Sequence, residues 1–465
     1  MAGLLSVPIR RQQILLFVAD LGLLLLSLML AFVIARFARF NILFLLDRFT
    51  VACGIYFTVH ALVFFVGQLY DTESRYEELR SFLYICGLVL VANLIIAMLF
   101  YFLPQWRIAR RVMAIQAPLA AILIYLWRRM HALVSRGLVA PRRVVLVGGG
   151  DSMASMVADL RAGYAPELIL VGIVDDRMPP GTAVAGLSVL GGTSELRAIV
   201  ARERVEIIVF SPGYSVAANG HTVRNVLELK VRGQKVYELA TFYKRVTGKV
   251  PVSSIGDHWL LFSQDFAGTA GGNGRNLKRL MDVILASAAL VLLAPLAAAL
   301  ALLIKATSRG PVLYRQERVG LDKRPYQLLK FRTMRVDAEE GTPRWATRDD
   351  DRVTPIGRFL RRTRLDEIPQ FVNVLRGEMS VIGPRPERPY FVERLEESVP
   401  YYALRFAAKP GLTGWAQVNH HYGGSVDDAH TKLQYDLYYI QEMSPFLDLV
   451  ILLKTFQTVL FRPGY

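Results

Sequence analysis

The sequence contains little cysteine and few acidic residues. Only two cysteines occur in 465 residues, and both Cys53 and Cys86 lie in apolar stretches. Cysteines in apolar stretches usually act as small buried hydrophobic residues, so neither a disulfide framework nor a zinc site is expected. The 39 Asp and Glu residues are outnumbered by 55 Lys and Arg residues, which gives a formal net charge of +16. The chain is therefore expected to have anionic partners.

Nucleic acid is not the anionic partner that the sequence favours. The chain lacks both zinc-finger spacing and a basic tail. Its hydrophobic fraction of 53% is high for a soluble protein and indicates membrane segments. We therefore predict a membrane protein of two or three domains, at roughly 150 residues per domain. A lipid bilayer and an anionic substrate then account for the charge, with no nucleic acid partner.

Four long apolar runs open the chain, and the first three are each about 20 residues or longer, enough to cross roughly 30 Å of hydrocarbon. The fourth is shorter and contains Pro118. Arg10 and Arg11 precede a first run that exceeds the apolar core of a signal peptide, so we expect this helix to remain. The runs are Ile14–Ile34, Leu43–Val66, Leu83–Phe102 and Val112–Trp127.

These runs predict four transmembrane helices in residues 1–135. Arginine is more frequent in the flanks that lie inside when the N-terminus is inside. This orientation places everything after Arg128 in the cytoplasm and predicts a multi-pass membrane protein.

Residues 136–267 are predicted to form a Rossmann-like α/β domain, because short apolar runs alternate with a helix-like stretch, Ser152–Leu160. The runs are Val144–Val147, Leu168–Val174 and Val205–Phe210. Glycines 148–150 follow the first run, and Asp175-Asp176 follow the second. Met153 stands where the third glycine of a dinucleotide fingerprint belongs. A nucleotide site, a plain tight turn and a regulatory or assembly role therefore all stay open.

A glycine-rich linker, residues 268–275, is predicted before a C-terminal, mainly helical catalytic domain, residues 276–465. Met281–Ile304 is a fifth apolar run, and the default prediction for it is another spanning helix. However, Pro295 interrupts the run, and a proline inside a helix kinks it. Basic residues also flank both ends of the run. We therefore predict a re-entrant membrane helix at residues 280–305, with a proline-kinked spanning helix as the alternative.

Basic clusters follow this run, and together they are typical of a pocket that neutralises phosphate oxygens. A solvated or lipid-facing surface is the alternative for any single cluster. The clusters are Arg315–Arg318, Lys330–Arg332, Arg358–Arg364 and the arginine of Pro384-Arg385-Pro386.

Asp366 and Glu367 lie among these cations. The segment Asp366–Leu375 is predicted to be a helix with Pro369 in its first turn. A helix cap would explain two acids there. The surrounding arginines instead favour chemistry: they would keep Asp366 ionised as a nucleophile. Adjacent helical residues point in different directions, so the other carboxylate would help to hold a divalent ion. Mg²⁺ is the cofactor that the donor set predicts.

Four motifs of this region resemble the bacterial sugar transferase family, the monotopic polyprenyl-phosphate hexose-1-phosphate transferases. The resemblance covers Asn276–Tyr465, and the helices and α/β domain before it are similar to the large members that start exopolysaccharide repeat units. Val418-Asn419-His420 departs from the family's VNG, which affects fine specificity. The motifs are Lys330–Met334 (KFRTM), Leu365–Gln370 (LDEIPQ), Gly377–Pro386 (GEMSVIGPRP) and Lys409–Val418 (KPGLTGWAQV).

The resemblance implies that Asp366 attacks the β-phosphorus of a UDP-sugar. UMP would leave, and undecaprenyl phosphate would then attack the aspartyl phosphosugar. Glu367 matches the acid assigned to the Mg²⁺ environment, and Pro295 matches the break of the re-entrant helix. The positions expected around the phosphates are Lys330, Arg332, Arg361 and Arg385, to which we add Arg315, Arg318 and, less firmly tied to a role, Asp448.

Two other functions remain as alternatives. A membrane-tethered nucleotide-sugar dehydratase or epimerase needs a complete glycine fingerprint and a Tyr-x-x-x-Lys pair, which residues 144–264 do not contain. A non-enzymatic scaffold predicts that Asp366 does no chemistry. His420, His421 and His430 are interpreted as surface residues rather than a metal cluster. The sugar, the ligand of the α/β domain and a homodimer stay open, and downstream glycosyltransferases are the expected pathway partners.

Overall fold

The computed structural model describes residues 11–35, 42–67, 69–70, 78–106, 108–138, 141–148, 151–160, 168–211, 221–252, 272–335, 338, 350, 352–420 and 425–461. The chain divides into two compact units, one of Ile9–Ala140 and one that contains Pro141–Tyr465.

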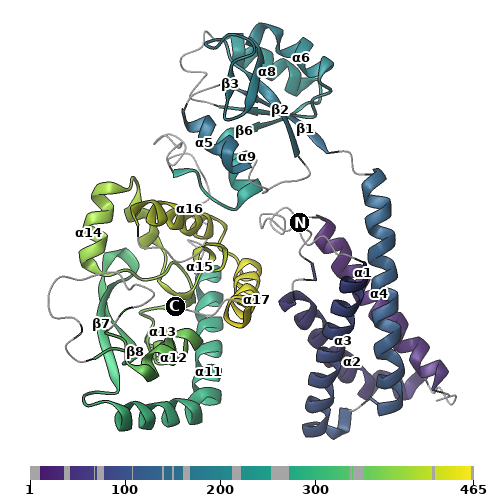
Figure 1. Ribbon diagram of the computed structural model, residues 1–465, viewed down its shortest axis with the longest axis vertical. Helices are drawn as coiled ribbons and strands as arrows, with labels where there is room; N and C mark the ends of the chain where they lie inside the picture. The colour runs from purple at the N-terminus through teal and green to yellow at the C-terminus, as the bar shows by residue number, and fades with distance from the viewer. Residues whose placement is uncertain are drawn as a thin grey trace. The chain divides into compact units, whose positions relative to one another are not determined.

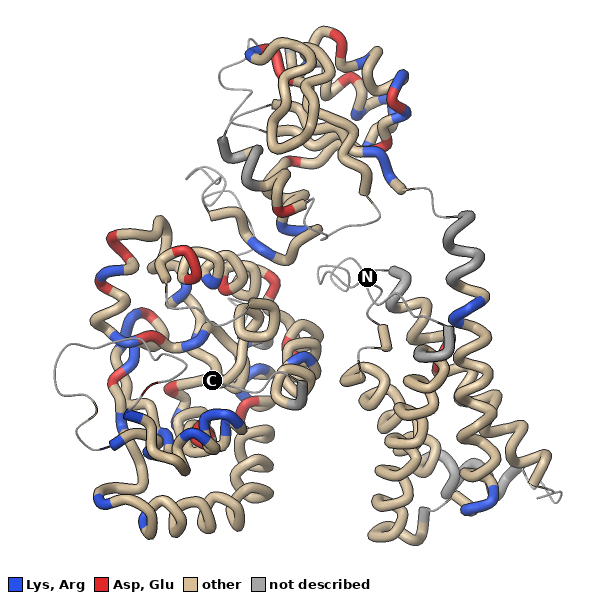
Figure 2. The backbone as a smooth tube through the Cα atoms, viewed as in Figure 1, with Lys and Arg blue, Asp and Glu red and all other residues tan. Residues whose placement is uncertain are grey.

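The first unit consists of apolar helices. They are α1 (Arg11–Ile34), α2 (Ile42–Val66), α3 (Glu78–Phe102) and α4 (Arg110–Leu138), with a 3₁₀ turn, η2 (Pro104–Trp106), before α4. Stretches long and apolar enough to cross a membrane lie in three of them, at Ile14–Ile34, Ser81–Phe102 and Arg110–His131, while α2 has the shorter apolar stretch Val51–Val66. Charged residues are sparse along these helices (Figure 2). The four predicted apolar helices are confirmed.

The fourth helix is longer than the predicted run Val112–Trp127, because α4 begins at Arg110 and ends at Leu138, and it passes through Pro118. Neighbouring helices can stabilise the backbone groups that a proline leaves unpaired. Polar side chains join the helices inside this unit. Arg128 of α4 donates to Asp20 of α1 at 2.6 Å, and Gln116 donates to the Tyr56 hydroxyl of α2.

The second unit begins with an α/β domain built on a six-stranded sheet (Figure 1). The strand order is β3-β4-β2-β1-β5-β6, and every neighbouring pair is parallel except β3 and β4. The strands are β1 (Arg142–Val147), β2 (Leu168–Val174), β3 (Ala183–Val184), β4 (Leu187–Gly191), β5 (Ile207–Phe210) and β6 (Lys235–Glu238). The predicted parallel pairing is confirmed for β4, β2, β1, β5 and β6, and the antiparallel β3 makes the sheet a mixed one.

Helices cover both faces of this sheet, because alternate residues of the buried strands face opposite sides. Val144 and Leu146 pack with the helices α5 (Asp151–Asp159) and α9 (Leu239–Thr247). Val145 and Val147 pack with α6 (Leu196–Arg202), which follows the 3₁₀ turn η4 (Thr193–Glu195), and with α8 (His221–Val231).

The C-terminal region is mainly helical, as predicted, and also contains two small two-stranded sheets. Its helices are α11 (Gly272–Thr307), α12 (Pro355–Thr363), α13 (Gln370–Arg376), α14 (Pro389–Ser398), α15 (Trp415–Asn419), α16 (Val426–Glu442) and α17 (Pro445–Phe461), with 3₁₀ turns η7 (Leu321–Lys323), η8 (Leu365–Glu367) and η9 (Tyr402–Ala407). The strands β7 (Leu313–Val319) and β8 (Pro325–Phe331) form an antiparallel hairpin, and β9 (Ser380–Ile382) pairs in parallel with β10 (Gly411–Thr413).

α11 is one helix with Pro295 inside it, where two half-helices are predicted, and it bends sharply along its course (Figure 1). The missing N–H and the ring of a proline account for such a bend. Near its end, Leu300 and Ile304 pack on Phe331 of the hairpin. Val291, Leu292 and Leu302 are each more than 70% exposed. The helix already includes residues 272–275 of the predicted linker, and its path through a membrane stays a prediction.

Candidate active site

The hairpin sorts its basic residues onto two faces. Residues directly opposite each other in an antiparallel pair lie on the same face, and successive residues alternate. The pairs Tyr314↔Lys330 and Arg318↔Tyr326 therefore share one face, while the pair Arg315↔Leu329 lies on the other. The Lys330 ammonium lies 5.1 Å from the centroid of the Tyr314 ring. Lys330 and Arg318 are thus brought to one side, and Arg315 is not.

Asp366 and Glu367 lie in the turn η8, between α12 and α13. Arg364 ends α12 in a left-handed conformation, with φ of 57°, and the turn continues through bonds from Glu367 N to Arg364 O and from Ile368 N to Leu365 O. The predicted helix Asp366–Leu375 is therefore wrong in its start, because α13 begins only at Gln370, after Pro369. Neither carboxylate occupies the residue before α13, so a simple helix cap does not explain the pair.

Asp366 lies among three cations. Burial, followed by the neighbouring Glu367, raises its pKa to about 6, and Lys330, Arg361 and Arg385 act in the opposite direction. The cations were expected to keep Asp366 ionised by lowering its pKa. In the protein alone they only partly offset desolvation and like-charge repulsion. A carboxyl group with this pKa is still mostly ionised at neutral pH.

Glu367 is fixed by an arginine from a distant part of the sequence. Arg385 Nη2 donates to Glu367 Oε1 at 3.0 Å. Arg361 Nε donates to the Thr333 hydroxyl at 3.0 Å, which anchors this arginine of α12 at the end of the hairpin. Lys330, Arg361 and Arg385 are therefore brought together with both carboxylates, as the phosphate-binding prediction requires.

Arg364 belongs to the same cluster as the carboxylates. The sequence placed it at the end of the basic cluster Arg358–Arg364, directly before the Leu365–Gln370 motif, but assigned it no role of its own. Burial lowers its pKa, while Glu367 and Asp366 act to raise it.

Three predicted phosphate-binding residues have other surroundings. Arg332 is 5% exposed and donates to the Ser308 carbonyl at 3.0 Å and hydroxyl at 2.5 Å, at the end of α11. Asp448 accepts from Lys278 Nζ at 2.8 Å and from the Tyr439 hydroxyl at 2.9 Å, which joins α17 to α11. Arg315 lines a cavity of about 640 Å³ with Arg324, Arg376 and Lys409.

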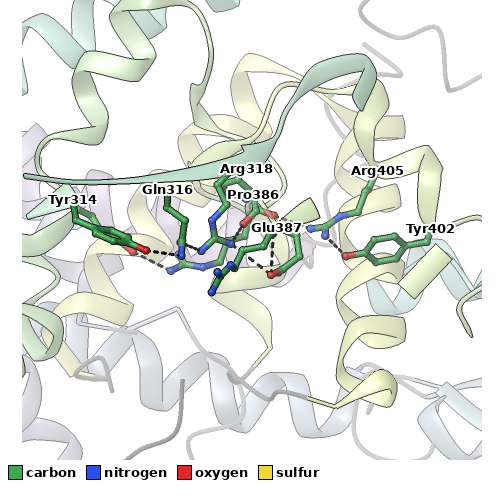
Figure 3. A network of polar contacts seen from close by, with 10 residues as sticks. Tyr314, Gln316, Arg318, Pro386, Glu387, Tyr402 and Arg405 are labelled. Carbon is green, nitrogen blue, oxygen red and sulfur yellow. Dashed lines mark hydrogen bonds and ion pairs between the residues drawn. The ribbon is translucent and has the colours of Figure 1, made fainter. Parts of the chain in front are cut away.

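Arg318 contacts the main chain of the loop that carries Arg385. Its guanidinium donates to the Pro386 carbonyl at 3.0 Å and to Gln316 Oε1 at 2.6 Å, and it pairs with Glu387 at 3.5 Å. Figure 3 shows this chain of contacts running from Tyr314 through Gln316 and Arg318 to the loop.

The carboxylate pair fits a magnesium ion that is shared with a substrate. Mg²⁺ is usually held by one or two carboxylates together with phosphate oxygens and water. Within the part of the chain that the structure describes, no group of three or more His, Cys, Asp or Glu gathers into an all-protein cage. His420 instead bonds Asp428 at 3.2 Å, and His421 lies outside the described residues.

The glycine turn of the α/β domain, for which a nucleotide site was one of the open interpretations, is described only in part. Gly148 has a positive φ of 101°, as a tight βα turn requires, whereas Gly149 and Gly150 lie outside the described residues. Asp176 accepts from the Thr193 amide and hydroxyl, at 2.7 and 2.6 Å, which ties the end of β2 to η4. Asp175 is 1% exposed and accepts from the Arg177 amide.

Comparison with known proteins gives two family matches, one in the C-terminal region and one that begins in the first unit and ends in the α/β domain. The family model described as "Bacterial sugar transferase" matches residues 273–462. A second model, described as "CoA-binding domain", matches residues 66–212.

Three curated relatives carry related names. The chain is 40% identical over 228 residues to a UDP-N-acetylgalactosamine-undecaprenyl-phosphate N-acetylgalactosaminephosphotransferase of Aeromonas hydrophila, a match over 48% of this chain and 52% of the relative. It is 44% identical to a UDP-glucose:undecaprenyl-phosphate glucose-1-phosphate transferase of Caulobacter vibrioides (strain ATCC 19089 / CIP 103742 / CB 15), over 39% and 69% of the two chains.

The third relative, the undecaprenyl-phosphate glucose phosphotransferase of Komagataeibacter xylinus, is 32% identical over 69% of this chain and 59% of its own. The matched segment spans about half the length of the Aeromonas relative, and more than two thirds of the Caulobacter relative. With the motifs and the assembled carboxylate–arginine cluster, these matches show that the chain belongs to the bacterial sugar transferase family.

Proposed function

We propose that this protein transfers a sugar-1-phosphate from a UDP-sugar to undecaprenyl phosphate, with release of UMP. The observation that carries the proposal is the cluster in which Asp366 and Glu367 are surrounded by Lys330, Arg361 and Arg385. Phosphoryl transfer needs a nucleophile and fixed positive charge where the phosphate oxygens lie. The names of the relatives support both substrates.

The chemistry is a double displacement at phosphorus. A carboxylate oxygen of Asp366 attacks the β-phosphorus, the bond from that phosphorus to the bridging oxygen breaks, and UMP leaves with the electron pair. A phosphate oxygen of the lipid then attacks the aspartyl phosphosugar and releases the Asp366 carboxylate. The product is undecaprenyl-diphosphate sugar, and we propose that this is the first membrane step in making an exopolysaccharide or a related glycan.

Asp366 is a better nucleophile candidate than Glu367. Arg385 holds one oxygen of Glu367 directly, at 3.0 Å. Asp366 is half-buried, and its raised pKa reflects poor solvation of the carboxylate, which leaves it more reactive towards phosphorus. Bound Mg²⁺, held by Asp366 and Glu367, would supply further charge neutralisation for the diphosphate.

The membrane placement follows from the same proposal. We infer that α1–α4 anchor the protein in the inner membrane, that α11 enters the bilayer and returns, and that the active site faces the cytoplasm, where nucleotide sugars are made. The exposed apolar residues of α11 support this placement. We also infer that the α/β domain is Rossmann-like, because its parallel strands follow an order found in doubly wound folds. Downstream glycosyltransferases would use the product.

The test is UMP release by purified protein from a panel of UDP-sugars, with undecaprenyl phosphate and Mg²⁺. Asp366→Asn should lose at least about 10³-fold in rate, because it removes the nucleophile. Glu393→Gln, which neutralises an exposed acid on α14, is the matched control and should retain the wild-type rate. Equal release by Asp366→Asn and wild type would exclude Asp366 as the nucleophile. No UMP from any donor, with the protein folded, would contradict the proposed activity.

A further inference from the structure

The loop that carries Arg385 cannot fix itself by ordinary backbone pairing. Prolines on both sides of Arg385, at positions 384 and 386, have no N–H to donate. The carbonyl oxygens of the loop remain as acceptors, and buried carbonyls need partners. The conformation of this loop therefore depends on donors from elsewhere in the chain.

Every carbonyl from Pro384 to Glu387 has such a donor. Two are backbone amides, of Gly411 to Pro384 at 2.8 Å and of Val319 to Glu387 at 3.0 Å. The other two are guanidinium groups, of Arg405 to Arg385 at 2.9 Å and of Arg318 to Pro386 at 3.0 Å. The two arginines approach from opposite sides (Figure 3). Four consecutive carbonyl oxygens thus accept hydrogen bonds around the position from which the Arg385 side chain extends.

Arg405 is the more deeply buried of the two donors. Its side chain is 7% exposed, and it pairs at 2.8 Å with Asp436 of α16, which is 2% exposed. It also donates to the Tyr402 hydroxyl at 2.5 Å. Burial alone would lower its pKa, but Tyr402, Asp436 and Glu387 outweigh burial and raise it, so the guanidinium stays charged.

A buried ion pair is a costly way to stabilise a fold, because apolar side chains of the same volume often do as well or better. The ion pair instead fixes orientation, because the planar guanidinium of arginine holds several hydrogen-bond acceptors in set positions relative to one another. The bonds connect Asp436 to Arg405, Arg405 to the Arg385 main chain, and the Arg385 side chain to Glu367.

We propose that Arg405, oriented by Asp436, is a positioning residue that holds Arg385 on the catalytic carboxylate pair. Arg405 touches no reacting atom: it fixes the Arg385 carbonyl, and this sets where the Arg385 guanidinium can reach. The inference rests on the proposed transferase activity for its kinetic consequence, but not for its structural one.

The kinetic test compares Arg405→Lys in two backgrounds. Lysine keeps the charge but lacks the fork, so it cannot bond Asp436, Tyr402 and the Arg385 carbonyl together. In the wild-type background we expect kcat for UMP release to fall about 10- to 100-fold, with KM for the UDP-sugar within about twofold, because a misplaced group costs rate rather than substrate affinity.

In the Arg385→Ala background, Arg405→Lys should have little further effect on kcat, since the residue it positions is gone. A role in general stability alone would give the same fold-loss in both backgrounds, and that result would overturn the proposal. Lys244→Met is the matched control, because it also removes a buried cation paired with α16, through Glu442 at 2.9 Å, while the donors described above for the four loop carbonyls are other residues. It should retain the wild-type kcat.

A second measurement needs no activity. Hydrogen exchange of the amides of Gly383, Arg385 and Glu387 should be faster in Arg405→Lys than in wild type or Lys244→Met. Unchanged exchange at these amides would overturn the proposal. Tyr402→Phe removes one bond of Arg405 and should give a smaller effect of the same kind, which keeps the test open if Arg405→Lys does not fold. If wild type released no UMP, the proposed function would fail, while the exchange result would still decide whether Arg405 fixes the loop.

Discussion

At the scale of single residues, Asp366, the proposed nucleophile, lies in an environment that is unfavourable for a carboxylate. Its carboxylate is desolvated and next to Glu367, and both effects favour the protonated form over the ionised form. Such groups are typical of catalytic sites, where function is kept at the expense of stability. The positive charges of Lys330, Arg361 and Arg385 offset only part of the rise in the pKa of Asp366.

The raised pKa predicts a pH-dependent gain in stability for Asp366→Asn. A folded-state pKa of about 6, above the usual 3.8, means that the folded protein holds this proton more tightly than the unfolded chain does. Wild type therefore loses stability as pH rises from about 4 to 6, and the loss persists above 6. The variant escapes this loss.

Thermal unfolding in detergent with a metal chelator, at pH 4 and pH 8, measures this effect. At pH 8 we expect Asp366→Asn to unfold on the order of 2 °C or more above wild type, and at pH 4 the difference should shrink. A variant less stable than wild type at pH 8 would contradict the assignment of the pKa shift.

At the scale of elements, the motif Lys330–Met334 contains two cations with different roles. Lys330 lies on the hairpin face near Asp366. Arg332 lies past the end of β8 and donates to Ser308, so it connects the hairpin to the end of α11. The sequence places both residues in one basic cluster, and only the strand geometry separates them.

Substitution by glutamine should therefore affect mainly stability at Arg332 and mainly activity at Lys330. Arg332→Gln should lower the stability by about 1–3 kcal/mol, because it removes a buried charged donor from the Ser308 carbonyl and hydroxyl, and should leave KM for the UDP-sugar within twofold. Lys330→Gln should change stability little and should reduce kcat/KM by at least about tenfold, through lost charge at the phosphates. Steady-state UMP release measures the activity of both variants, and thermal unfolding measures their stability. A raised KM for Arg332→Gln would mean that Arg332 binds the substrate phosphates after all.

The elements also show what the sequence could and could not predict. Hydrophobic runs were sufficient for α1–α4 and for the strands β1, β2 and β5, because burial has a period that can be read from one chain. The gathering of Arg385 with Glu367 could not be read from composition, since the two belong to separate elements that are packed by long-range contacts. The helix predicted at Asp366 was wrong because the left-handed Arg364 has no sequence signature.

At the scale of the whole molecule, the residues directly after α9, 248–252, contact the catalytic region. Trp415 Nε1 donates to the Gly248 carbonyl at 2.9 Å, and Val250 N donates to the Gln434 carbonyl at 3.0 Å. Trp415 belongs to the Lys409–Val418 motif and stacks on Tyr438 of α16. One motif residue thus supports the attachment of the α/β domain.

Trp415→Phe should weaken this attachment without affecting the chemistry. The variant loses one buried hydrogen bond, worth about 1 kcal/mol, and keeps the aromatic contact with Tyr438. We expect a lower unfolding temperature and kcat within twofold of wild type, measured by thermal unfolding and UMP release. A loss of kcat comparable to that of Arg405→Lys would instead mean that this contact acts on the active site.

Side chains of the β7–β8 hairpin alternate between its two faces, and this limits the insertions and deletions that the hairpin tolerates. Deleting one residue from β8 would turn every later side chain to the opposite face. Lys330 would then face the cavity that Arg315 lines, and Leu329 or Phe331 would replace it beside the carboxylates. Among functional variants, natural or engineered, strand lengths before Lys330 should therefore change by two residues at a time, and single insertions should be confined to the turn at Leu321–Lys323.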